Sequence, residues 1–69
     1  MTLYTDGASR GNPGDAAWAY VIVRDGAVVA GRSECIGTAT NNVAEYHAVI
    51  NGLEAARAFT SGRLDVRSD

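Results

Sequence analysis

The sequence predicts an α/β fold in which a mixed sheet is built in the order strand, strand, strand, helix, strand. Apolar residues alternate over 16–24 and lead into Asp25-Gly26, the dipeptide most typical of a tight hairpin. The apolar period then changes to that of a helix over 41–59. A helix that joins two strands indicates a crossover, so we expect the last strand to run parallel to the first.

Three strands are expected in the first half of the chain, at residues 2–6, 16–24 and 27–36. The segment from Gly7 to Asp15 is rich in glycine and contains Asn12-Pro13, which predicts a loop. Strand 16–24 is apolar on both faces, which predicts a central strand covered on both sides. Arg32 and Glu34 indicate that strand 27–36 has one wetter face.

The second half is expected to hold a helix over 41–59 and a strand over 63–68. Thr40, Asn41 and Asn42 are all suitable N-caps, and Ser61-Gly62 ends the helical pattern. An apolar stripe repeats along the helix at intervals of three and four, at Tyr46, Val49, Ile50 and Leu53. Small residues flank this stripe and allow close packing on a sheet, at Ala44, Ala48, Ala55 and Ala56. In the last strand, Leu64 and Val66 are expected to point inward.

Composition places the chain among globular proteins, because 46% of its 69 residues are hydrophobic and 20% are charged. A chain this short buries only roughly 60% of its unfolded surface, so we expect one domain or part of one. Its single cysteine excludes an internal disulfide, and no apolar run is long enough to span a membrane. The start MTLYTDG lacks the pattern of a signal peptide, which predicts a cytoplasmic protein.

The charge is weakly acidic, with a formal net charge of −2 from six basic and eight acidic residues. This balance argues against nonspecific nucleic-acid binding driven by neutralisation of phosphates. It leaves open binding through a divalent metal, which would reverse the local sign of the charge.

Three acids stand where predicted elements begin or end: Asp6 after the first strand, Glu45 early in the helix and Asp69 after the last strand. If the first and last strands are parallel neighbours, Asp6 and Asp69 emerge at the same edge of the sheet. Converging carboxylates repel one another unless a hard cation such as magnesium or manganese lies between them. From spacing alone, ordinary surface acids are an equally good interpretation.

Three motifs resemble type 1 ribonuclease H in order and content. They are Tyr4-Thr5-Asp6-Gly7-Ala8-Ser9-Arg10-Gly11-Asn12-Pro13-Gly14, Thr40-Asn41-Asn42-Val43-Ala44-Glu45-Tyr46 and Val66-Arg67-Ser68-Asp69. Together they cover most of the chain and match the amino-terminal half of that family's domain. The resemblance implies a ribonuclease H-like mixed sheet that lacks the later helices and the fifth strand, so that 1–69 is a partial domain with no second domain.

The resemblance also implies an endonuclease that cuts the RNA strand of RNA/DNA hybrids and leaves 5′-phosphomonoesters. Two divalent ions, Mg²⁺ or in its place Mn²⁺, would serve this hydrolysis. Asp6 would bridge both ions, and Glu45 and Asp69 would complete the second site. Glu45 would also sense an RNA 2′-hydroxyl, the group that distinguishes RNA from DNA.

The residues that the resemblance assigns to the RNA/DNA hybrid lie in two segments. They are Gly7, Ala8, Ser9, Arg10, Gly11 and Asn12 after the first acid, and Thr40, Asn41 and Asn42 at the helix start. The loop would read 2′-hydroxyls through backbone groups, the asparagines would lie in the minor groove, and Thr40 and Asn42 would hold a DNA phosphate. Without the family, Asn12-Pro13-Gly14 is a plain turn and the helix-start residues are caps.

Three other residues invite a function but favour structural roles. His47 lies two positions from Glu45 and points about 200° away around the helix, which predicts a surface or packing histidine. Cys35 is expected to pack as a small hydrophobe, and Trp18 to lie in the core or on the sheet surface. For Arg10, a phosphate contact and a solvated position are both compatible with the sequence.

The family's fourth acid lies downstream of its third, so we expect the 69-residue chain alone to be inactive. Two alternatives remain: a hybrid-binding module without cleavage, or one piece of an assembly of several chains. We also expect an exposed apolar helix face or sheet edge, and therefore self-association and no membrane partner.

Overall fold

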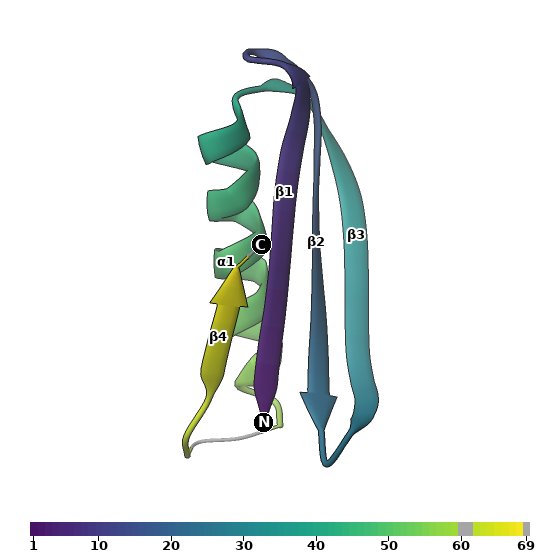
Figure 1. Ribbon diagram of the computed structural model, residues 1–69, viewed down its shortest axis with the longest axis vertical. Coiled ribbons are helices and arrows are strands. Elements are labelled where there is room, and N and C mark those ends of the chain that lie inside the picture. Colours follow the sequence, from purple (N-terminus) through teal and green to yellow (C-terminus); the bar gives the residue numbers. More distant parts are fainter. Residues whose placement is uncertain (60–61, 69) are drawn as a thin grey trace.

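The computed structural model describes residues 1–59 and 62–68 and has the predicted order of elements (Figure 1). It contains β1 (Thr2–Gly11), β2 (Gly14–Arg24), β3 (Ala27–Ala39), α1 (Asn41–Ala56) and β4 (Asp65–Ser68). The strands form one sheet in the order β3-β2-β1-β4. β1 pairs antiparallel with β2 and parallel with β4, which confirms the mixed sheet and the crossover.

The two hairpins differ in how well they follow the prediction. Asp25 and Gly26 form the β2–β3 turn with φ of 51° and 78°, the left-handed pair that a two-residue hairpin needs. The loop predicted from Gly7 to Asp15 is wrong, because β1 continues to Gly11 and pairs with β2 down to Gly14. The turn is only Asn12-Pro13, with a cis peptide bond. Glycine here permits a close turn and does not interrupt the strand: a Cβ on Gly14 would lie 1.7 Å from the Arg10 carbonyl oxygen.

Helix α1 begins as predicted and ends earlier than predicted. Thr40 is the N-cap, and its hydroxyl accepts a hydrogen bond from the Val43 amide at 3.3 Å. The regular helix stops at Ala56 because the next turn tightens: the amides of Ala58 and Phe59 donate to carbonyls three residues back. The predicted stop at Ser61 lies outside the described residues.

The helix packs on the sheet through its small residues. Its buried positions are Ala44, Ala48, Gly52 and Ala56, whereas the apolar stripe predicted from the sequence points outward except at the half-buried Val49. Tyr46, Ile50 and Leu53 are 67%, 47% and 40% exposed. The close approach explains this choice, because a Cβ on Gly52 would lie 2.7 Å from a Leu3 methyl carbon. The apolar helix face expected from the sequence is therefore present and exposed.

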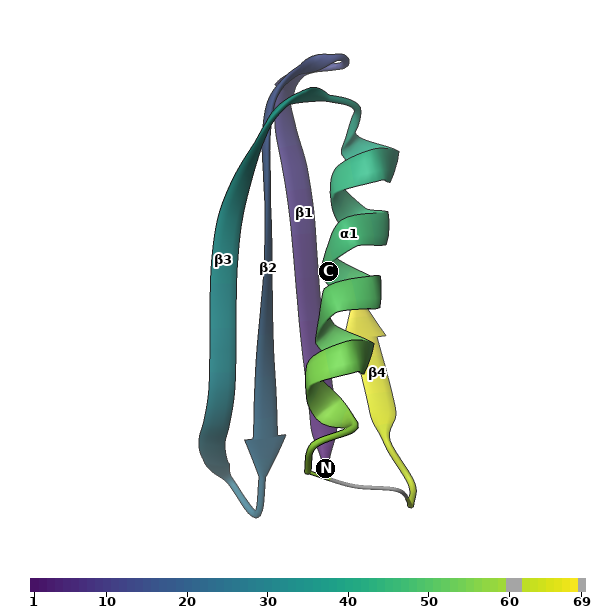
Figure 2. The same cartoon turned by 180° about the vertical axis from the view of Figure 1, so that it is seen from behind.

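The helix covers one face of the sheet, as both ribbon views show (Figure 2). The core on that face combines Leu3, Trp18, Tyr20 and Ile22 with the helix alanines. On the other face of β2, Ala17 is exposed and Val21 is half-buried, so the prediction that both faces are covered is wrong for the described residues. The alternation of apolar residues identified a central strand correctly but could not show how many layers lie over it.

Strand β4 is shorter than predicted, Asp65–Ser68 instead of 63–68, and pairs with Thr2 to Thr5. Leu64 packs partly against the core as expected. Val66 does not, since it is 45% exposed. No helix in the described part of the chain is long and apolar enough to cross a bilayer.

The helix also lies close to the sheet at Gly7. A Cβ built on this residue would lie 2.3 Å from the Ala44 carbonyl carbon and 2.4 Å from the Glu45 amide nitrogen. These atoms belong to the backbone, so they cannot move aside as a side chain can. Only glycine fits where β1 passes the first turn of α1.

We therefore predict that Gly7→Ala lowers the free energy of unfolding by about 1–3 kcal/mol, the usual cost of overpacking. Urea unfolding followed by circular dichroism measures this change. Gly31→Ala is the matched control, because its new Cβ would meet its nearest atom, the Tyr20 carbonyl oxygen, at an ordinary 3.5 Å. Equal stability of the two variants would contradict the tight contact.

Candidate metal site and nucleic-acid interface

Two of the three predicted acids lie near the contact between β1 and α1. Asp6 precedes Gly7 on β1, and Glu45 supplies the amide against which Gly7 packs. Asp6 alternates with the buried Thr5 and Gly7, so its side chain is exposed on the face away from the helix. Glu45 is half-buried on α1. The sequence predicts that these acids converge. In the structure their backbones lie close together, while the Asp6 side chain lies on the face of the sheet opposite to α1.

The third acid, Asp69, lies outside the described residues. The described pairing of β4 with β1 ends at Thr5 and Ser68, the residues directly before Asp6 and Asp69. Beyond Thr5, the edge of β1 that faces β4 has no partner strand in residues 1–59 and 62–68.

The carboxylates of Asp6 and Glu45 suit a hard cation but are too few to enclose one. Neither takes part in a hydrogen bond or ion pair with any residue that the structure describes. Free carboxylate oxygens are the donors that Mg²⁺ and Mn²⁺ prefer. Within the described ranges, however, no three histidine, cysteine or acidic side chains are grouped closely enough to hold a metal ion.

A hollow of about 280 Å³ lies between α1 and the end of β4. Its lining consists of Asn42, Glu45, Tyr46, Val49 and Ser68. Thr5 pairs with Ser68, and its hydroxyl is buried without a hydrogen-bond partner in the described part of the chain. Sequence reasoning did not select Ser68 or Thr5 as site residues, although both directly precede a predicted catalytic acid.

Polar side chains tie the first hairpin turn to the start of α1. The Ser9 amide donates to Asn41 Oδ1 at 2.7 Å, and the Asn41 amide donates to Asn12 Oδ1 at 3.1 Å. The Ser9 hydroxyl lies 2.9 Å from the same Asn41 oxygen and also donates to the Gly11 carbonyl. The structure thus brings together the two segments that the sequence assigned to the hybrid.

The sequence leaves open whether the residues at the helix start cap the helix or contact a phosphate, and the structure is compatible with both roles. Thr40 caps the helix through its hydroxyl oxygen, and Asn41 uses its amide in the bond to Asn12. The first turn contains no acidic residue. The positive end of the helix dipole is therefore uncompensated there, which favours an anion such as a phosphate.

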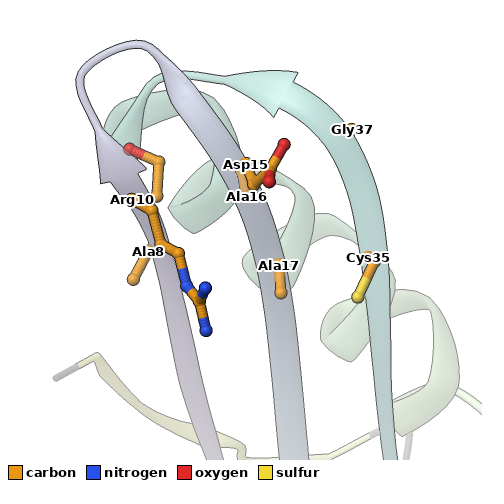
Figure 3. A pocket seen from close by; sticks show the side chains of 8 residues that line it. Ala8, Arg10, Asp15, Ala16, Ala17, Cys35 and Gly37 are labelled. Carbon is orange, nitrogen blue, oxygen red and sulfur yellow. The ribbon is translucent and has the colours of Figure 1, made fainter.

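A second hollow, of about 560 Å³, lies on the open face of the sheet near the first hairpin (Figure 3). Ala8, Ala17 and Cys35 lie side by side across β1, β2 and β3 and form its floor. Cys35 is exposed, so the prediction that it packs as a buried hydrophobe is wrong: its strand has no cover on that face among the described residues. Arg10 lines the same hollow and forms no ion pair with Asp15 opposite it, within residues 1–59 and 62–68.

The remaining two residues have the structural roles that the sequence favoured. Trp18 is 4% exposed and stacks on Tyr20, with ring centroids 6.1 Å apart. The Arg32 guanidinium lies 5.8 Å from the Trp18 ring centroid, where it makes a cation–π contact, and it forms an ion pair with Glu34. His47 is exposed, and its carbonyl accepts a bond from the Asn51 amide.

Comparisons with known proteins agree on one family. The RNase H family model matches residues 1–69, which is the whole chain. Ribonuclease HI of Halobacterium salinarum is 54% identical over 67 residues, covering 96% of this chain and 34% of that protein. The crystal structure of RNase H1 from Halobacterium salinarum NRC-1 superposes with a TM-score of 0.89 at 52% identity, covering 99% of this chain and 52% of that one.

A further solved structure is LC11-RNase H1 in complex with an RNA/DNA hybrid. It superposes with a TM-score of 0.89 at 42% identity and covers 97% of this chain and 52% of its own. The chain therefore spans about a third of the length of the curated relative and about half of the solved relatives.

We predict that Thr40→Ala lowers the free energy of unfolding by about 1 kcal/mol, because the Val43 amide loses the oxygen that caps it. Thermal unfolding followed at 222 nm measures the loss. Thr40→Ser keeps the hydroxyl and should unfold near the wild-type temperature. A serine variant as unstable as the alanine variant would assign the effect to the lost methyl group and contradict the cap.

Proposed function

The chain belongs to the RNase H family, and on that premise we propose that the protein hydrolyses the RNA strand of RNA/DNA hybrids. The observation that carries the proposal is the contact of Gly7 with the backbone of Ala44 and Glu45, which brings the backbones of Asp6 and Glu45 close together. The relative LC11-RNase H1, solved in complex with an RNA/DNA hybrid, supports this substrate class.

We propose Asp6, Glu45 and Asp69 as the carboxylates that hold divalent ions, Mg²⁺ or Mn²⁺. The free oxygens of Asp6 and Glu45 fit this task, and Asp6 is exposed. In two-metal-ion hydrolysis, bound divalent ions supply the Lewis acidity that activates the attacking water and stabilises the leaving 3′ oxygen. The side chain of Glu45 would in addition meet an RNA 2′-hydroxyl, which DNA lacks.

The protein's own residues would position the hybrid around these acids. The hairpin from Gly7 to Asn12 lies against the helix start through the bonds among Ser9, Asn12 and Asn41. Both segments are largely exposed and, apart from Arg10, carry neutral donors and acceptors in place of a basic patch. Such an interface fits the minor groove, and the uncompensated helix start at Thr40 and Asn42 fits a phosphate of the DNA strand.

Two features support a role for residues 1–69 as a part of a larger unit. The chain spans about half of the solved relatives. The outward stripe of α1, 40% to 67% exposed at Tyr46, Ile50 and Leu53, offers an apolar surface for another chain or for a second copy. The alternative function is accordingly a hybrid-binding module, or one piece of a multi-chain assembly.

We predict that Asp6→Asn abolishes magnesium-dependent cleavage of a labelled hybrid by the full-length protein while its fold remains intact. The loss should exceed the about 10- to 100-fold cost of removing a residue that only supports a metal ligand. Asp25→Asn is the matched control, since it removes an exposed acid from the distant β2–β3 turn, where asparagine tolerates the left-handed φ. Cleavage retained in Asp6→Asn would refute the assignment.

A second assay separates the enzyme from the binding module. We predict that residues 1–69 alone cut no hybrid at any magnesium or manganese concentration, because the family resemblance places a fourth acid downstream of Asp69. Gel analysis of an end-labelled hybrid tests this, with labelled double-stranded DNA as the control substrate. Robust cutting by the 69-residue chain would show that its own residues suffice.

A further inference from the structure

Strand β3 forms the outer edge of the sheet, on the side away from β4 (Figure 1, Figure 2). In residues 1–59 and 62–68, no strand pairs with its outer side, and α1 packs mainly on β1 and β2. We propose that this edge pairs antiparallel with the same edge of a second copy of the chain, with Ser33 on the two-fold axis. The proposal is independent of the proposed function, because it concerns a different surface.

The register of β3 against β2 limits the pairing to a short segment. This register skips Val29 and Ile36, which have no partner on β2 and therefore form bulges. Residues 30–35 lie between the two bulges and pair with β2 without interruption. Because a bulge twists an edge strand away from a neighbour, the segment between the bulges is the part of β3 that is regular enough to take another strand.

This regular segment carries two charges of opposite sign, Arg32 and Glu34. Their side chains point to the same face of the sheet and form an ion pair at 2.8 Å, and they are 60% and 49% exposed. Charges on an edge strand commonly protect it from pairing with another strand. A neutral pair of opposite charges gives this protection only in registers that place like charges together, and in one register it attracts a second copy.

Two-fold symmetry decides which registers are available. In a symmetric antiparallel pair that continues one sheet, opposite residues point to the same face, so the axis passes through a residue. An axis at Arg32 or at Glu34 places like charges opposite each other, which is unfavourable. Only an axis at Ser33 places each Arg32 opposite Glu34 of the second copy. The four charges then alternate in sign both along and across the two strands.

The residues beside the charges also suit this register. Ala30 and Ile36 pack partly against the core that α1 covers, and in the proposed pair Ala30 lies beside Ile36 of the second copy. On the other face, Gly31 lies opposite Cys35 of the second copy, so no two bulky side chains meet there. The paired segment covers only residues 31–35, so we expect a weak dimer with a dissociation constant above about 1 μM.

Charge variants of the full-length protein test this pairing, with sedimentation velocity measured over a range of concentrations. Arg32→Glu and Glu34→Arg each place like charges opposite each other, so we expect each variant to dimerise at least about tenfold more weakly than the wild type. An equimolar mixture of the two variants should restore the dimer, because an acidic edge then meets a basic one. Arg57→Glu is the matched control, since it reverses another exposed, ion-paired arginine, at the end of α1.

A second experiment measures the register. Ser33 lies opposite itself on the axis, so the double variant Ser33→Cys, Cys35→Ser should form an intermolecular disulfide under mild oxidation. The wild-type thiol is the control, because the two copies of Cys35 would lie about 13 Å apart along the strands, beyond the reach of a disulfide. Electrophoresis without reducing agent separates the crosslinked dimer from the monomer.

Several results would overturn the proposal. A wild-type protein that stays monomeric up to about 1 mM has no such pairing. A dimer that persists in both charge variants, or that their mixture does not restore, lies on another surface, such as the outward stripe of α1. A Ser33→Cys variant that forms no crosslink, or a wild type that crosslinks equally well through Cys35, refutes the register. Each of these results leaves the proposed function in place, because β3 carries none of the acids proposed to hold divalent ions.

Discussion

The contact between Gly7 and the first turn of α1 is the constraint on which the rest of the structure depends. A side chain at this position would collide with the backbone of Ala44 and Glu45, so the helix can lie this close only because β1 carries no Cβ there. The same closeness requires Ala48, Gly52 and Ala56 on the helix, which turns the larger apolar residues outward. It also sets Asp6 and Glu45 within one residue of a shared contact. The absence of a side chain at Gly7 thus determines both how α1 packs on the sheet and where Asp6 and Glu45 lie.

Much of the fold follows from local sequence signals, and the errors fall where contacts between elements decide the structure. Asp25-Gly26 identifies its turn because the left-handed backbone it needs excludes most other residues. Glycine and proline in the first hairpin predict a loop, whereas β2 offers small partners that let β1 continue to Gly11. The inward face of α1 could not be predicted from hydrophobicity alone, since the distance between helix and sheet, set at Gly7 and Gly52, decides whether alanine or leucine fits.

The site is predicted less completely, because its geometry joins distant parts of the chain. Residue types and spacing select Asp6, Glu45 and the asparagines. They do not reveal that Ser9 and Asn12 each bond to Asn41, about 30 residues away, since such contacts depend on where the hairpin ends relative to the helix. Nor do they indicate that Ser68 lines a hollow with Glu45 or that the Thr5 hydroxyl is buried without a partner in the described chain. The register of β1 against β4, which pairs Thr5 with Ser68, is the information needed to identify these two residues.

The bond between Asn12 and the Asn41 amide has a consequence for how this chain can change during evolution. Exposed turns normally accept inserted residues, because little depends on their length. The turn at Asn12-Pro13 is different, since one added residue would move the amide away from the helix start and leave the backbone of Asn41 without its acceptor. The turn at Asp25-Gly26 carries no such tie to another element in the part of the chain that the structure describes. Length variation and engineered tags therefore belong at the second hairpin, while the first must keep both its length and Asn12.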